Sequence, residues 1–251
     1  MKYTYKRQRE VLYSETDREL SLGVIGCFDI TQDMITAFFE TIGSDNYTLF
    51  TKDKALWVVT KTRIRFYSKP AWNSKLHCVS SITSLQKLRL NLLTTVTGEK
   101  GDPVFEAFQE CCPIDADART VRKIESVSFP GDAEPDLPEG MPARPFSPLT
   151  ADLSGFERAG SRTVRLSDLD FSNHANNVSY VRYILDTLDS RKVQGDLVTD
   201  FEIHYLSESR ESDELEIYRK ESAGEDFADF AILNNGAVCT RARVRKTANG
   251  K

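Results

Sequence analysis

The chain has 251 residues, of which 40% are hydrophobic and 28% are charged, and its formal net charge is −5. This composition is that of a globular protein, and the length allows one large domain or two ordinary ones with a real core. The acidic balance argues against nucleic acid as a partner, and no apolar run is long enough to span a membrane.

Cysteine content and the N-terminal segment indicate where such a protein works. The five cysteines are odd in number and lack metal-ligand spacing, which favours reduced thiols in a cytoplasmic protein. The basic residues near the N-terminus are not followed by an apolar stretch, so we expect no secretory signal. We therefore expect a cytoplasmic protein with no metal and no other cofactor.

The first half is predicted to be one helix followed by about four antiparallel strands. After a strand-like start at 3–13 and the run SLGVIGCFDIT, Thr31 can cap a helix. The helix is indicated by apolar residues at i, i+3, i+4 and i+7, namely Ile35, Phe38, Phe39 and Ile42, and Gly43 ends it. Alternation then predicts strands at 56–67, 76–83, 85–96 and 104–111.

A proline-rich linker separates the first half from a second half of similar organisation. Six of the nine prolines fall within 130–148, which gives predicted domains at 1–129 and 150–251 with a linker at 130–149. The second half begins with a strand at 163–166 and a helix with Val178, Val181, Leu185 and Leu188 on one stripe. Strands are predicted at 198–206, 214–218, 226–233 and 238–245, the last two joined by an Asn-Asn-Gly turn.

The segment from Ser167 to Leu188 holds the residues most suited to chemistry. A cluster of short polar residues stands immediately before the second apolar helix: Asp168, Asp170, Ser172, Asn173, His174, Asn176 and Asn177. Such residues favour turns and helix starts, where unpaired N–H groups can stabilise an anionic oxygen. A histidine, a carboxylate and these N–H groups together are the parts needed to hydrolyse an acyl bond. The simpler alternative is a turn and a helix cap without catalysis.

Two motifs resemble those of the acyl-acyl-carrier-protein (acyl-ACP) thioesterase family, bacterial type and related to the plant oleoyl-ACP hydrolases. The run from Asp170 to Tyr180 is similar to the family pattern Asp-x-Asn-x-His-x-Asn-Asn-x-x-Tyr, and Tyr205-Leu-Ser-Glu208-Ser209 is similar to Tyr-x-x-Glu-x. The resemblance implies an α+β fold, a tandem (double) hotdog in which each half wraps an antiparallel sheet around a central helix. It also implies that the substrate is a fatty acyl thioester of the carrier protein.

Each motif residue has a predicted role. His174 is the expected general base or water-positioning group, with Asp170 as its carboxylate partner and Glu208 as the catalytic carboxylate that the resemblance implies. The backbone near Asn176 and Asn177 is expected to bind the thioester oxygen, and Asp168 is interpreted as a turn residue. His204 is interpreted as structural, because it lies about 13 Å from Glu208 along a strand.

The chain departs from the family pattern at two positions. Ser172 stands where the family has its catalytic asparagine. Either Ser172 performs part of the asparagine's role through its single hydroxyl, or Asn173 replaces the asparagine, or activity is impaired. Ser209 stands where some members carry a cysteine, which excludes a cysteine nucleophile there. Direct attack by water is then the simplest scheme.

The two halves align at a constant offset that pairs the helix of the first with that of the second. Ile35 falls on Val181, Phe38 on Ile184, and the same shift places Phe28 opposite His174 and Val24 opposite Asp170. The alignment predicts that the first half has no catalytic motif and is left to form an acyl-chain pocket. Two fused copies are compatible with a monomer or a homodimer.

The leading prediction is therefore hydrolysis of fatty acyl-ACP in fatty acid biosynthesis, releasing free fatty acid. The alternatives are a hotdog acyl-CoA thioesterase, an enoyl-thioester hydratase, and a relative that binds acyl chains or the carrier without turnover. A basic surface should receive the acidic carrier protein, and two clusters are candidates: Arg119, Arg122 and Lys123, and Arg241, Arg243 and Arg245.

Overall fold

The computed structural model divides the chain into two compact units, Met1–Pro145 and Phe146–Lys251. It describes residues 1–141, 145–149, 152–188, 196–222 and 224–248. The described residues of the predicted linker form neither helix nor strand, while its residues 142–144 lie outside the described part. No helix of the described residues is long and apolar enough to cross a membrane.

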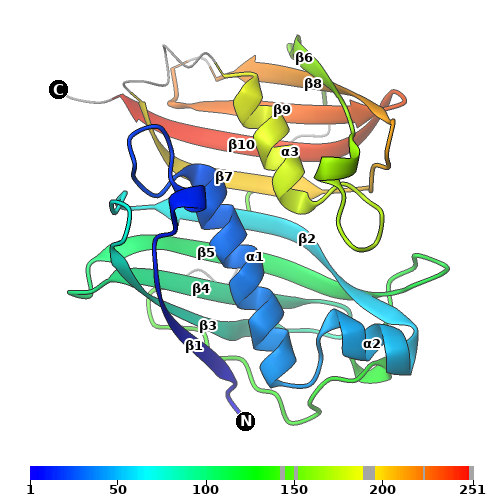
Figure 1. The fold of residues 1–251 in the computed structure, drawn as a ribbon. Helices are drawn as coiled ribbons and strands as arrows, with labels where there is room; N and C mark the ends of the chain where they lie inside the picture. The colour runs from blue at the N-terminus through cyan, green and yellow to red at the C-terminus, as the bar shows by residue number, and fades with distance from the viewer. Residues whose placement is uncertain (142–144, 150–151, 189–195, 223, 249–251) are drawn as a thin grey trace. The chain divides into compact units, whose positions relative to one another are not determined.

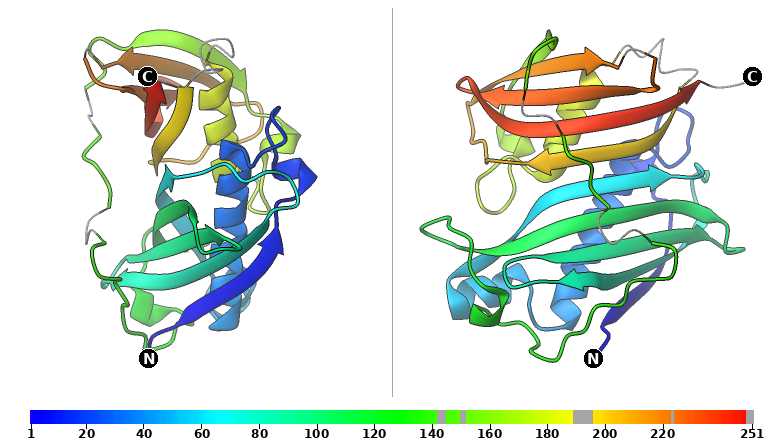
Figure 2. Two further views of the ribbon diagram at one scale, coloured as in Figure 1. Left: turned by 90° about the vertical axis from the view of Figure 1, so that its left-hand side faces the viewer. Right: turned by 180° about the vertical axis from the view of Figure 1, so that it is seen from behind.

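The N-terminal unit is a five-stranded antiparallel sheet with a long helix across one face (Figures 1 and 2). The sheet order is β1-β3-β4-β5-β2. In chain order the elements are β1 (Thr4–Glu10), α1 (Val24–Thr41), α2 (Asn46–Asp53), β2 (Ala55–Phe66), β3 (Lys75–Leu85), β4 (Leu90–Gly98) and β5 (Pro103–Asp115), with short 3-10 turns at Tyr13–Glu15 and Ile124–Ser126.

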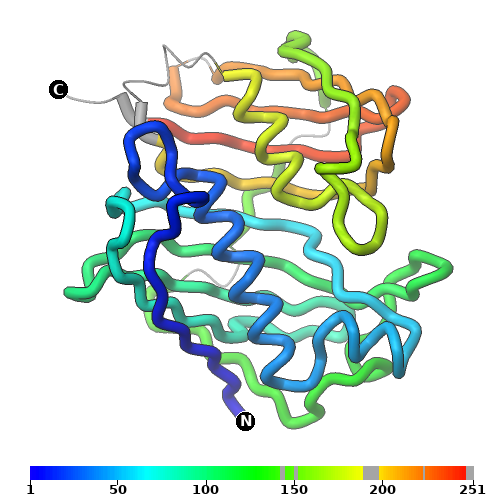
Figure 3. Tube along the Cα trace, in the orientation of Figure 1, coloured from blue at the N-terminus to red at the C-terminus, as the bar shows by residue number. Residues whose placement is uncertain are grey.

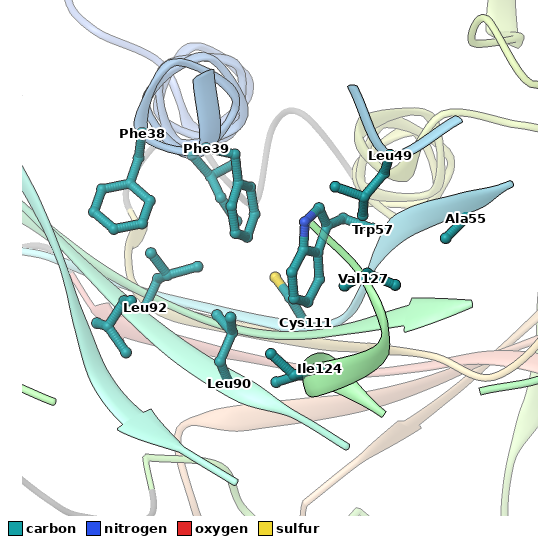
Figure 4. Packing of buried hydrophobic residues seen from close by; sticks show 12 residues of the cluster. Phe38, Phe39, Leu49, Ala55, Trp57, Leu90, Leu92, Cys111, Ile124 and Val127 are labelled. Carbon is teal, nitrogen blue, oxygen red and sulfur yellow. The ribbon is translucent and has the colours of Figure 1, made fainter. Parts of the chain in front are cut away.

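The core of this unit lies between α1 and the sheet (Figure 4). Phe39 of α1 stacks on Trp57 of β2, with ring centroids 4.7 Å apart and planes 10° from parallel. The indole N–H of Trp57 donates to the carbonyl oxygen of Ser44 at 2.8 Å, so its polar atom is satisfied inside the core. Helix α1 is thus fixed to the sheet by aromatic packing at its C-terminal end.

The helix start predicted for this half is wrong, and one short helix is missing from the prediction. Helix α1 begins after Gly23, well before the predicted cap, and Thr31 lies buried inside it with its hydroxyl donating to the carbonyl oxygen of Cys27 at 2.7 Å. The missing helix is α2, which Asp45 caps by accepting from the N–H of Thr48 at 3.0 Å. The four strands predicted after the helix are confirmed as β2, β3, β4 and β5, and the strand-like start predicted at 3–13 is β1.

We expect Gly26→Ala to destabilise the protein, because a Cβ at Gly26 would overlap the backbone carbonyl oxygen of Glu15. Helix propensity favours alanine by about 1 kcal/mol, but overpacking against backbone typically costs about 1–3 kcal/mol. Because the carbonyl is backbone and cannot rotate away, we expect the upper end of this cost and a net loss of about 2 kcal/mol in the free energy of unfolding, measured by urea denaturation. The control is Gly131→Ala, where no atom lies within 4 Å of the added Cβ. Unchanged stability in Gly26→Ala would contradict this packing.

The C-terminal unit is built in the same way (Figures 1 and 2). Its sheet order is β6-β8-β9-β10-β7, which repeats the first-unit order β1-β3-β4-β5-β2 strand for strand, and α3 lies on one face. The elements are β6 (Glu157–Thr163), α3 (Asn177–Asp186), β7 (Asp196–Tyr205), β8 (Glu214–Glu221), β9 (Phe227–Asn234) and β10 (Ala237–Ala248), with a 3-10 turn at Leu166–Asp168 in place of the end of the predicted strand.

The predicted offset between the halves is wrong by two helical turns. The helix caps Gly23 and Asn176 are 153 residues apart, whereas the apolar alignment used a shift of 146. Val24 and Phe28 therefore lie inside α1, and they are not the counterparts of Asp170 and His174, which precede α3. The error has a simple cause: an apolar stripe with 3.6 residues per turn repeats almost unchanged after seven residues.

Candidate active site

The polar residues before α3 form a closed loop on the C-terminal unit. Its ends are joined by an isolated bridge between Leu169 and Ala175, and the N–H of Asp170 donates to the carbonyl oxygen of His174 at 2.9 Å. Asn173 adopts a left-handed conformation with φ 60°, which asparagine tolerates better than most residues. The sequence of short polar residues thus makes a tight turn that fixes the backbone on both sides of His174.

Inside this loop Asp170, Ser172 and His174 form a chain of hydrogen bonds. The Ser172 hydroxyl lies 2.7 Å from Oδ1 of Asp170 and 3.1 Å from Nδ1 of His174. The same Asp170 oxygen accepts from the N–H of Ser172 at 2.8 Å, so it is held as an acceptor. Because a hydroxyl has one hydrogen and Ser172 gives it to Asp170, Nδ1 of His174 is the donor to Ser172. This leaves Nε2 as the atom available for proton transfer.

Glu208 meets His174 from a different part of the chain. Its Oε2 lies 3.3 Å from Nε2 of His174, and the two side chains are 39% and 11% exposed. Glu208 does not close a strand as predicted, because β7 ends three residues earlier at Tyr205. A main-chain hydrogen bond holds the two segments together, since the N–H of Ala175 donates to the carbonyl oxygen of Ser209 at 2.8 Å. No sequence pattern indicates this bond.

The asparagines of the motif serve mainly as backbone elements. The Asn176 side chain caps α3 by accepting from the N–H of Val178 at 2.8 Å, and the Asn176 N–H donates to the carbonyl oxygen of Asp168 at 2.8 Å. The backbone N–H of Asn176 is therefore committed to the loop and is not left for a substrate oxygen. The N–H of Asn177 takes part in none of the hydrogen bonds found among the described residues, and it lies in the first turn of α3. Asn173 is exposed, at the tip of the turn.

Two further predicted roles can be compared with the geometry. Asp168 holds the 3-10 turn, with its carboxylate accepting from the N–H of Arg165 at 2.8 Å. His204 is paired with the buried Glu202 at 2.8 Å and packs edge-on against Phe146. Burial acts to raise the pKa of Glu202, but hydrogen bonds from His204 and Ser147 outweigh it and lower that pKa. The Asp168 carboxylate and the His204 imidazole are thus both engaged in local structure.

Comparisons with known proteins agree with this architecture. The family model of the acyl-ACP thioesterase N-terminal domain matches residues 2–127, and that of the C-terminal domain matches residues 157–246. An acyl-ACP thioesterase from Bacteroides thetaiotaomicron has a similar structure, with a TM-score of 0.86 and 19% identity over 98% of both chains. The 12:0-ACP thioesterase from Umbellularia californica gives a TM-score of 0.77 and 17% identity over 98% of this chain and 95% of that one.

The comparison with curated proteins gives no match. The two solved structures establish the fold as a double hotdog of the α+β class, as the sequence resemblance implies. The two domain models together span most of the chain, in the order in which the two units occur. The chain therefore belongs to the acyl-ACP thioesterase family and is a thioester hydrolase.

Proposed function

We propose that the protein hydrolyses fatty acyl-ACP with His174 and Glu208 as the catalytic pair, releasing free fatty acid and the carrier thiol. The observation that carries this proposal is the meeting of Nε2 of His174 and Oε2 of Glu208 at 3.3 Å, in a loop that fixes the other imidazole nitrogen. A water molecule bonded to Nε2 would also lie within reach of the carboxylate. Family membership supports the substrate class.

The proposed steps follow from these contacts. Nε2 of His174 takes a proton from water as the oxygen attacks the thioester carbonyl, and the Glu208 carboxylate stabilises the imidazolium that forms. The Asn177 N–H at the start of α3 would donate to the carbonyl oxygen as it gains negative charge. Collapse of the tetrahedral intermediate breaks the carbon–sulfur bond, and the imidazolium returns its proton to the departing thiolate.

Ser172 is proposed to orient His174 in place of the family asparagine. We expect Ser172→Ala to lower kcat about ten-fold, equivalent to about 1.4 kcal/mol, because the imidazole loses its Nδ1 acceptor while its Glu208 contact remains. Ser172→Asn, which restores the family residue, should retain or raise kcat. Steady-state thiol release measures both variants, and wild-type kcat in Ser172→Ala would remove Ser172 from the site.

The docking surface for the carrier protein is also a proposal, and side-chain contacts reduce the number of candidate arginines. Arg122 donates to the carbonyl oxygens of Asp53 and Ser126, at 2.6 and 2.8 Å, which commits it to the fold. Arg243 is paired at two atoms with Asp229, at 2.7 and 2.8 Å. Both are thus weaker docking candidates than the sequence indicated. Replacing an arginine that truly docks the carrier protein should raise KM for acyl-ACP and leave the kinetics with acyl-CoA unchanged.

The function is tested by thiol release from a panel of acyl-ACP thioesters of varied chain length beside the matching acyl-CoA. Faster turnover of acyl-ACP supports the proposal, equal rates favour a general acyl-CoA thioesterase, and hydration of an enoyl thioester without thiol release contradicts it. The same panel tests whether the N-terminal unit shapes an acyl-chain pocket. We place the enzyme in the cytoplasm, which accords with five buried and unpaired cysteines.

A further inference from the structure

The N-terminal unit contains a loop that repeats the one carrying His174. A 3-10 turn at Tyr13–Glu15, an isolated bridge from Thr16 to Leu22 and the helix cap Gly23 follow one another in the first unit. The 3-10 turn at Leu166–Asp168, the bridge from Leu169 to Ala175 and the cap Asn176 follow in the second, each 153 residues later. In Figure 3 each loop stands immediately before the helix of its own unit, α1 or α3.

The two loops also agree in their hydrogen bonds. In both, the aspartate N–H donates to the carbonyl oxygen four residues on, at 2.8 and 2.9 Å, and the aspartate carbonyl oxygen accepts from the residue three on, at 3.1 Å in each. In both, the aspartate carboxylate accepts from the N–H two residues on, at 2.9 and 2.8 Å. The matched residues are Asp17 with Asp170, Glu19 with Ser172, Leu20 (φ 54°) with Asn173 (φ 60°), and Ser21 with His174.

The segment that supplies Glu208 has a counterpart as well. The N–H of Leu22 donates to the carbonyl oxygen of Pro70 at 2.8 Å, as that of Ala175 does to Ser209 at 2.8 Å. Three residues further on, Asn73 and Ser212 both have positive φ, 63° and 70°. The residue before Pro70 therefore takes the place of Glu208, and that residue is Lys69. The greater spacing in the first unit comes from its longer helix, with 18 residues in α1 and 10 in α3, and from α2, which has no counterpart among the described residues of the second unit.

In the first copy the charge at the position of Glu208 is reversed, from negative to positive. A hydroxyl replaces the imidazole, and the ammonium of Lys69 replaces a carboxylate. Lys69 Nζ lies 2.5 Å from Oδ2 of Asp17 and 3.5 Å from Oε2 of Glu19. The aspartate that orients the histidine in the second copy thus holds a lysine in the first.

We infer that the loop Thr16–Leu22 with Lys69 is a second, silent copy of the candidate active site, in which an ion pair has replaced the proton-transfer pair. Each chain then has one reaction centre and one copy that keeps the backbone without the chemistry. That the first copy is inactive rests on the proposed function of the C-terminal loop, whereas the structural equivalence of the two loops does not.

The test introduces a histidine at position 21 and follows its pKa by NMR in Ser21→His and in Ser21→His/Lys69→Glu. If position 69 faces position 21 as Glu208 faces His174, the lysine should lower the imidazole pKa and the glutamate should raise it, with a difference of about one unit or more. Equal imidazole pKa values in the two variants would overturn the inference. The titration needs no turnover, so a failure of the proposed function is recognised separately.

A control variant checks that the pKa effect is local, and a second measurement applies where the histidine variant does not fold. Ser21→His/Lys52→Glu makes the same charge change on the exposed face of α2, at the other end of α1, and should leave the imidazole pKa as in Ser21→His. Where Ser21→His fails to fold, urea midpoints of Asp17→Asn, Lys69→Met and the double variant serve instead. If the double variant is no less stable than the less stable of the two single variants, the ion pair is supported. If the stability losses of the single variants add in the double variant, the ion pair is overturned.

Discussion

Replacement of His174 by alanine is expected to lower kcat/KM for acyl-ACP at least about 100-fold, or about 2.7 kcal/mol. The loss follows from the geometry, because Nε2 is the only imidazole atom left for proton transfer once Nδ1 is bonded to Ser172. Binding of the acyl-carrier protein should change little, since the imidazole acts on water and not on the acyl chain. Thiol release under single-turnover conditions separates the two effects.

The matched control for this variant is His77→Ala, which removes a partly buried histidine from β3 of the other unit. It should keep kcat/KM within about two-fold, which is the ordinary effect of a substitution remote from the chemistry. A His174→Ala enzyme with wild-type turnover would disprove the proposed mechanism, even though family membership would still stand. An equal loss in both variants would indicate a general loss of stability.

Glu208→Gln is expected to lower kcat at least about 100-fold as well, while KM stays nearly unchanged. The amide keeps the size of the side chain but cannot stabilise the imidazolium that forms when His174 takes a proton. Since Glu208 lies outside β7 and is 39% exposed, the substitution should leave the free energy of unfolding almost unaltered. Steady-state kinetics with a urea denaturation curve measures both expectations.

The carboxylate at this position can be probed further with Glu208→Asp. Aspartate retains the charge but is shorter by one methylene group, so it should recover part of the lost kcat. A Glu208→Gln enzyme as fast as wild type would show that His174 alone activates the water. A variant that loses activity together with stability would place Glu208 in the fold and not in the reaction.

The sequence predicted the helix-on-sheet architecture of both units because their apolar periodicity is regular. The strands were placed well where alternation was clear, as in β2 and β10. Capping signals were less decisive, since Thr31 and Asp45 are both good cap residues and only the second acts as one. A cap is chosen by where the chain must turn to pack, which short-range patterns do not contain.

The candidate site was predicted as a set of residues but not as an arrangement. Asp170, Ser172 and His174 lie within one loop, so their proximity follows from their spacing. The choice between Ser172 and Asn173 required the structure, because it depends on which side chain the positive φ of Asn173 turns outward. The approach of Glu208 depends on a main-chain bond between Ala175 and Ser209, residues far apart in sequence.

Leu20 and Asn173 occupy the same left-handed turn position in two loops that share an aspartate but otherwise differ in the charge and chemistry of their side chains. Asparagine adopts this conformation readily, and leucine does so at a cost in strain of about 1 kcal/mol. The shape of the loop therefore depends on its main-chain bonds and on the shared aspartate, and little on the other side chains that it carries. Such a loop is suited to protein engineering, because new reactive side chains can be introduced while the backbone conformation is kept.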